Sequence, residues 1–240
     1  MKSIINFYLF MFIAISCWSQ REIQNLEVTY VKAYKNYKDS SDTAPIPMKN
    51  LEYKLICNRN ESRFELIPFL ELDHDGSDKR INSKGGGNGV FYKNIKEELK
   101  LHQFETFVDG KLYLVKPSFK EYNWVITEES KTIGGYLCYK AYHEDSYKAP
   151  DQTGKMKTYQ IKIIVWFTPE INFPFGPAGF DGLPGLVLEK SLGSFYFIAS
   201  KIQFNQEVNI VRPKDGIKKS KQEYLEMLRE NYKKLINEGK

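Results

Sequence analysis

The 240-residue chain is poor in the residues on which metal sites depend, with 3 cysteines and 3 histidines. There is no Cys-x-x-Cys pair, and His74, His102 and His143 have no ligand partners at the spacings of zinc sites. Nor does any motif indicate a bound cofactor. We therefore expect neither a metal centre nor a cofactor.

The common catalytic signatures are also missing. The chain contains neither the Gly-x-Ser-x-Gly nucleophile elbow nor His-Glu-x-x-His. Residues 84–89 are glycine-rich but lack the Gly-Lys-Ser/Thr ending of a phosphate loop, and the acidic residues 73–78 lack the spacing of a calcium loop. The adjacent Glu128 and Glu129 would face opposite sides of a strand, which is wrong for shared acid/base chemistry. We predict no catalytic residues.

Neither sign of charge dominates. The 35 Lys and Arg residues face 30 Asp and Glu residues, a net charge of +5, which is no signature of nucleic-acid binding. A hydrophobic share of 42% and a charged share of 27% are ordinary for a globular chain. This composition argues against disorder and against a protein with many membrane spans.

The only long apolar run lies at the N-terminus. Lys2 precedes the apolar residues 4–15, and the small residues Cys17 and Ser19 follow at the positions required for cleavage before Gln20. The run is shorter than the ~20 residues that a membrane-spanning helix needs. We therefore predict a signal peptide over residues 1–19.

Export places the mature chain in the periplasm, on the outer-membrane surface or outside the cell. In a second interpretation the chain is cleaved before Cys17 and lipidated there, but Ala14 stands where a lipidation motif usually has Leu. Cys57 and Cys138 remain after cleavage. They either form a disulfide, as an oxidising compartment favours, or lie apart as two buried thiols.

Aromatic residues are abundant, with 16 Tyr and 16 Phe, and they favour strands. In residues 158–168 the apolar Ile161, Ile163, Val165 and Phe167 would share one face. Similar runs separated by turn residues occur along the chain: 26–30, 51–57, 111–115, 123–126, 136–141, 186–188 and 195–198. We predict a mainly β domain over residues 20–240, built as a single antiparallel curved sheet, an open barrel or a sandwich.

The C-terminus differs from the rest. Ser220 and Glu223 form a capping box, and apolar residues then recur at helical spacing, which predicts an amphipathic helix over residues 220–238. Two roles are open: packing on the sheet, or association with the surface of a membrane. Packing is favoured because glutamates dilute the lysines of this segment.

Residues 169–188 combine four prolines and four glycines with apolar side chains such as Phe173 and Leu186. Proline and glycine together allow a path that is sharply bent and still rigid. Such a segment either plugs the end of a barrel or lines a pocket, and plugging is the more common role of an apolar loop.

Within this segment the residues Gly182-Leu183-Pro184-Gly185-Leu186-Val187 resemble the signature of the GLPGLI family, with Val187 in place of the final Ile. Residues 131–141, 165–171 and 176–177 are similar to further blocks of the same family. The resemblance implies a secreted, mostly β protein of the Gram-negative envelope. It implies no established activity, cofactor or catalytic residue.

The aromatic surplus and the rigid apolar segment favour a non-enzymatic module that binds an apolar or peptide ligand. The side chains expected to line its pocket are Trp124, Trp166, Phe175, Phe180 and Leu183. The alternative is an interaction module that docks to another envelope protein, which predicts an exposed apolar patch and no internal cavity. An unrecognised hydrolase is the weakest hypothesis, and nothing in the sequence indicates an oligomeric state.

Overall fold

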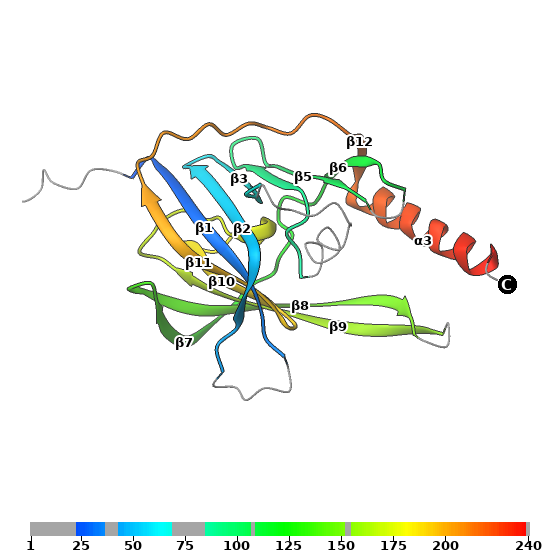
Figure 1. Ribbon diagram of the computed structural model, residues 1–240, viewed down its shortest axis with the longest axis horizontal. Helices are drawn as coiled ribbons and strands as arrows, with labels where there is room; N and C mark the ends of the chain where they lie inside the picture. Colours follow the sequence, from blue (N-terminus) through cyan, green and yellow to red (C-terminus); the bar gives the residue numbers. More distant parts are fainter. Residues whose placement is uncertain (1–22, 37–42, 69–84, 107–108, 152–154, 239–240) are drawn as a thin grey trace, which may run out of the picture.

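The computed structural model describes residues 23–36, 43–68, 85–106, 109–151 and 155–238 (Figure 1). The predicted signal peptide and Cys17 lie outside the described residues. The described strands form one sheet in the order β12-β6-β5-β4-β3-β2-β1-β11-β10-β9-β8-β7. The strands are β1 (Asn25–Tyr34), β2 (Ile46–Asn58), β3 (Glu61–Leu66), β4 (Val90–Asn94), β5 (Leu99–Glu105), β6 (Leu112–Lys116), β7 (Val125–Ile133), β8 (Tyr136–Pro150), β9 (Met156–Thr168), β10 (Leu186–Leu192), β11 (Phe195–Phe204) and β12 (Ile217–Ser220).

The sheet is curved and open, because β12 and β7 stand at its two ends and do not pair with each other. The predicted mainly β fold with one curved sheet and a C-terminal helix is confirmed. The strand pairs are antiparallel except for β12 and β6, which run parallel. A parallel neighbour requires a crossover rather than a tight turn. Residues 205–216 provide it, running across the top of the molecule in Figure 1 from β11 to β12.

The core lies on one face of this sheet, which we call the inner face. It is marked on β1 by Leu26, Val28 and Tyr30, all at 0% exposure. The alternation predicted for residues 158–168 is confirmed for Ile163, Val165 and Phe167, which are buried on the same side of β9. Alternation with period two therefore decides which side chains meet in the core.

The proline- and glycine-rich segment packs against the inner face as a plug. Its apolar side chains are almost completely buried: Ile171 (1%), Phe173 (3%), Phe175 (1%) and Leu183 (2%). Tyr30 donates its hydroxyl to the Val187 carbonyl oxygen at 2.6 Å, which ties the end of the segment to β1. A 3-10 turn, η1 (Pro177–Gly179), lies at the middle of this segment.

Cys57 and Cys138 are two separate, buried free thiols, so the disulfide alternative is wrong. Cys57 lies on β2 and Cys138 on β8, and the sheet order places four strands between them. Burial also raises the pKa of both thiols, that of Cys138 to about 11. Since the thiolate is the reactive form, both cysteines are poorly reactive as well as separated.

The helix α3 (Lys221–Glu238) begins with the predicted capping box. The Ser220 backbone N–H donates to the Glu223 carboxylate at 2.6 Å, and the Glu223 N–H donates to the Ser220 hydroxyl at 3.2 Å. Tyr224 packs edge-on against Phe104 and Tyr113. The rest of the helix extends away from the sheet (Figure 1). No helix in the described ranges is long and apolar enough to cross a membrane.

Gly185 of the signature should tolerate substitution far less than Gly182. Both have positive φ, +151° and +90°, but an added Cβ at Gly185 would lie 2.1 Å from the Thr168 carbonyl oxygen, whereas Gly182 has nothing within 4 Å. We expect Gly182→Ala to cost about 1–2 kcal/mol of unfolding free energy through backbone strain, and Gly185→Ala at least about twice that. Urea unfolding measures both. Equal losses would show that the contact with β9 is unimportant.

Candidate functional site

The cross-strand register builds one long row of side chains along the inner face. Val28, Leu55, Phe64, Phe91, His102 and Val115 are successive partners on β1 to β6. Direct cross-strand partners point to the same side of a sheet. Phe91 stacks on His102 with ring centroids 3.9 Å apart, and Phe64 meets Phe91 edge-on at 6.1 Å. The row is therefore aromatic where it crosses β3, β4 and β5.

A second row runs beside the first, at a distance of two residues on each strand. It pairs Ser62 with Lys93 and Lys93 with Lys100. Lys93 and Lys100 are only 6% and 4% exposed, although lysine is rarely buried without a partner. The inner face thus brings an aromatic row and a row of buried ammonium groups side by side.

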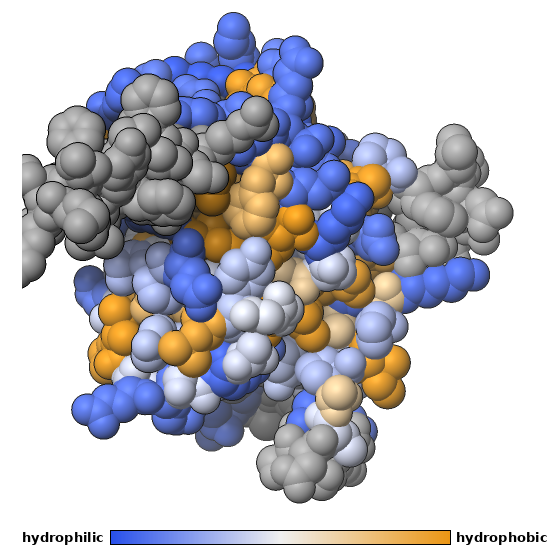
Figure 2. Space-filling model, turned by 90° about the vertical axis from the view of Figure 1, so that its left-hand side faces the viewer, coloured by the Kyte–Doolittle hydropathy of each residue, from blue (hydrophilic) through white to orange (hydrophobic). Residues whose placement is uncertain are grey.

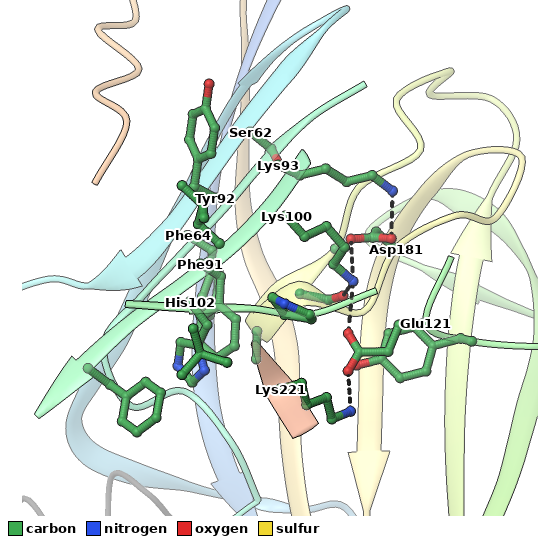
Figure 3. Close-up of a pocket in the computed structure, with 18 of the residues that line it drawn as sticks. Ser62, Phe64, Phe91, Tyr92, Lys93, Lys100, His102, Glu121, Asp181 and Lys221 are labelled. Carbon is green, nitrogen blue, oxygen red and sulfur yellow. Dashed lines mark hydrogen bonds and ion pairs between the residues drawn. The ribbon is translucent and has the colours of Figure 1, made fainter. Parts of the chain in front are cut away.

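These rows form one wall of a partly open cavity of about 270 Å³ (Figure 3). The opposite wall is the plug at Gly176, Ala178 and Gly179, together with Tyr122. The first turn of α3 closes the remaining side with Lys221, Tyr224 and Leu225. The cavity therefore depends on three parts of the chain that are far apart in sequence.

A chain of ion pairs crosses one end of the cavity (Figure 3). Asp181 of the plug accepts from Lys93 at 2.7 Å and lies 3.3 Å from Lys100. Lys100 also contacts Glu121 at 3.0 Å, and Glu121 in turn binds Lys221 at 2.5 Å. Each carboxylate thus contacts two ammonium groups. With three lysines and two carboxylates, the cluster carries one excess positive charge.

The charges of this cluster determine the pKa of Glu121. Burial alone would raise the pKa of its carboxyl group, but the ammonium groups of Lys100 and Lys221 outweigh burial and lower it. Glu121 therefore stays ionised. Among the described residues no group of three or more His, Cys, Asp or Glu side chains is arranged to hold a metal ion.

His102 is a neutral member of the aromatic wall. Burial lowers its pKa to about 4. Its Nε2 lies 2.7 Å from the Asn88 carbonyl oxygen, and since a carbonyl only accepts, Nε2 carries the proton. The ring lies between Phe91 and Phe104, with centroids 3.9 Å and 4.3 Å away. His102 thus acts here as a flat ring that shapes the cavity.

Two further lysines are buried beyond the cavity. Lys32 and Lys190 are both 0% exposed; Lys32 donates to the Gly86 carbonyl oxygen at 2.7 Å, and Lys190 donates to that of Gly85. Both ammonium groups also lie over the Phe197 ring, at 5.3 Å from its centroid. Burial lowers the pKa of each to about 7.

The side chains expected to line the pocket lie elsewhere. Phe175, Phe180 and Leu183 belong to the core, at 1%, 7% and 2% exposure. Trp124 is partly buried and donates its indole N–H to the Asp181 carbonyl oxygen at 2.8 Å, so it supports the cavity from behind. Trp166 lies on the opposite face of the sheet, 4.4 Å from Lys131 Nζ. None of the five lines the cavity, and their role in binding a ligand stays a prediction.

Sequence reasoning missed the cavity because it did not predict β3, β4, β5 and β12. The alternation that could have revealed β5 is present. Leu99, Leu101 and Gln103 alternate with Lys100, His102 and Phe104. It was hard to interpret because a lysine and a histidine stand at inward positions, where a core strand usually has apolar residues.

Part of the chain matches a protein family whose function is unknown. A family described as "Protein of unknown function (Porph_ging)" matches residues 124–189. This range holds the plug, with its signature residues 182–187, but not β3 to β6. It agrees with the prediction of an uncharacterised family, while the GLPGLI name stays a prediction. No curated protein sequence matches the chain significantly.

The solved structure of PNGF-II shares the fold at low sequence identity. PNGF-II in two crystal forms is 17% identical, with TM-scores of 0.53 and 0.52 over 87% of this chain. The chain spans about a third of PNGF-II, 33% and 34% in the two structures, so the likeness concerns the fold of one part of that protein. The Mycobacterium tuberculosis lipoprotein LppX is 12% identical to this chain, and the alignment covers 83% of this chain and 96% of LppX. Its TM-score of 0.26 is too low to support an argument.

Removing the carboxylate of Asp181 should strongly destabilise the protein. Asp181→Asn leaves the buried Lys93 and Lys100 without a shared counter-ion, and we expect a loss of about 3–5 kcal/mol in unfolding free energy. The matched control is Glu144→Gln, which breaks the exposed pair with Lys162 and should cost less than about 1 kcal/mol. A similar loss in both variants, measured by urea unfolding, would contradict the role assigned to Asp181.

Lys190 should make stability depend on pH above neutrality. Its pKa is about 7 in the folded protein against 10.5 when free, so the unfolded chain binds more protons between these values and stability rises with pH. Lys190→Met should therefore reduce the rise in unfolding free energy between pH 7 and 10, while Lys32, whose pKa is also about 7, keeps part of it. Lys201→Met, on the exposed part of β11, is the control and should keep the slope. A slope unchanged in Lys190→Met would refute the assignment.

Proposed function

We propose that the protein is a non-enzymatic binding module of the cell envelope. Its cavity takes a small ligand with an apolar or aromatic body and one anionic group. A single observation carries the proposal: the inner face places an aromatic row directly beside a lysine cluster with one excess positive charge. Export remains part of the proposal and rests on the sequence of residues 1–19.

The apolar part of the ligand follows from the walls. Phe64, Phe91, Phe104 and Tyr122 present ring faces and edges to the cavity, and these surfaces favour flat or aliphatic groups. The volume of about 270 Å³ lies just below the range of roughly 300–1,000 Å³ typical of sites for drug-sized molecules. A ligand of one ring with a short chain fits this size better than a long lipid.

The anionic part follows from the lysines. Lys93 and Lys100 are held in place by Asp181 and Glu121, whereas the Lys221 side chain is 52% exposed at the edge of the cavity. An exposed ammonium group on a flexible stem can turn toward a bound anion, and Glu121 then keeps its contact with Lys100. A carboxylate in the cavity would neutralise the excess charge.

The cavity favours ligand binding over the docking alternative, which predicts an exposed apolar patch and no internal cavity. On the face drawn in Figure 2, the visible apolar residues form several separate patches divided by hydrophilic ones. The pairing of both carboxylates with lysines likewise supports a non-enzymatic role, because neither is left as a free general base.

The test is isothermal titration calorimetry of the full chain with 3-phenylpropionate and with the uncharged 3-phenylpropanol. We expect the carboxylate to bind about tenfold more tightly, since a charge-assisted hydrogen bond is stronger than a neutral one. Lys221→Gln should reduce the affinity for 3-phenylpropionate to that for the alcohol. Lys120→Gln, exposed and outside the cavity, is the matched control and should change neither affinity.

Two results would reject the proposal. If neither compound binds the full chain, the cavity is a packing feature and the docking alternative gains support. If both variants lose affinity equally, the lysine cluster does not direct the anion and only the net charge of the protein matters.

A further inference from the structure

A second concave site lies on the other side of β5. The inward residues Lys100, His102 and Phe104 face the cavity, whereas Leu99 lies on the outer side with Tyr92 and Leu114 in a small separate cluster. Above this cluster is an open groove of about 690 Å³. It is bounded by β5, β6, the crossover at residues 212–214 and the start of α3. We call it the basic groove.

The charge of the basic groove is strongly one-sided. Five basic side chains line it against one carboxylate, that of Glu223: Lys116, Arg212, Lys214, Lys218 and Lys219. Glu223 is already engaged by the backbone of Ser220, and Arg212 is paired with Glu97 at 2.9 Å. None of the four lysines has a carboxylate within 4.0 Å among the residues that the structure describes.

Exposed apolar side chains stand beside these lysines. Val211 is 54% exposed and directly precedes Arg212. Leu112, at 41% exposure, lies on the same face of β6 as Leu114 and Lys116, both of which line the groove. Apolar side chains next to unpaired lysines are the combination found on proteins that rest on anionic lipid surfaces.

We infer that the basic groove is a docking surface for an anionic phospholipid bilayer. The lysines would meet the lipid phosphates, while Val211 and Leu112 would enter the interfacial region. A site for one free anion needs donors that converge on a point, usually with a buried charged group among them. Here Lys116, Lys214 and Lys218 are exposed and spread over β6, the crossover and β12, which suits an extended anionic surface.

The inference does not depend on what the cavity binds. Successive residues of β5 point to opposite sides, so docking through the basic groove would leave the cavity on the other side of the strand. The two sites meet only at the first turn of α3 and at Leu101, which lines both.

The test is co-sedimentation of the full chain with vesicles of one part phosphatidylglycerol to two parts phosphatidylcholine, and with vesicles of phosphatidylcholine alone. We expect binding only to the first, weakening as salt is added. The double variant Lys214→Gln/Lys218→Gln should bind about 25-fold more weakly, about fivefold for each lysine removed. Urea unfolding of the same variant should match the original protein, because both side chains are exposed.

The matched control is Lys148→Gln/Lys201→Gln, which removes the same charge from exposed positions of β8 and β11 and should keep the affinity within about twofold. An equal loss in both double variants would overturn the inference in favour of net charge alone. No binding to phosphatidylglycerol vesicles would overturn it directly. Polyglutamate added at the same concentration of negative charge as the lipid should not displace the vesicles. If it does, the groove is a site for soluble acidic chains instead.

Discussion

The buried contact of Asp181 with Lys93 and Lys100 is the constraint on which the site depends. It joins the plug to β4 and β5, two strands that the sheet order places far from β9 and β10, between which the plug runs. Two ammonium groups on the inner face would be costly without a counter-ion, and the carboxylate is supplied from the opposite side of the cavity. The same contact closes the core and leaves the cavity beside it.

The plug therefore has two sides with different roles. Its apolar side chains, such as Phe173 and Phe175, fill the core, while its backbone at Gly176 and Gly179 and the carboxylate of Asp181 face the cavity. The two roles considered for this segment, plugging the core and lining a pocket, are both present. They are carried by different residues of the same segment, because the bent chain turns Phe173 and Phe175 toward the core, and Gly176, Gly179 and Asp181 toward the cavity.

The C-terminal crossover and helix connect the cavity with the basic groove. Residues 205–216 carry the chain from β11 to β12, on the far edge of the sheet, and Arg63 donates to the Val211 carbonyl oxygen at 2.6 Å along this path. The first turn of α3 thereby stands between the cavity and the basic groove. One short element thus contributes Lys221 and Tyr224 to one site and Glu223 to the other.

The sequence by itself determined the mainly β class, the alternation of β9, the capping box at Ser220 and the conformation-restricting residues of the plug, because each depends on neighbours in the chain. Only the tertiary structure decided that Cys57 and Cys138 stay apart, that Trp166 lies on the outer face, and that Lys93 and Lys100 are buried. A buried lysine cannot be recognised from its own strand. The carboxylate that makes its burial tolerable lies on Asp181, more than eighty residues along the chain.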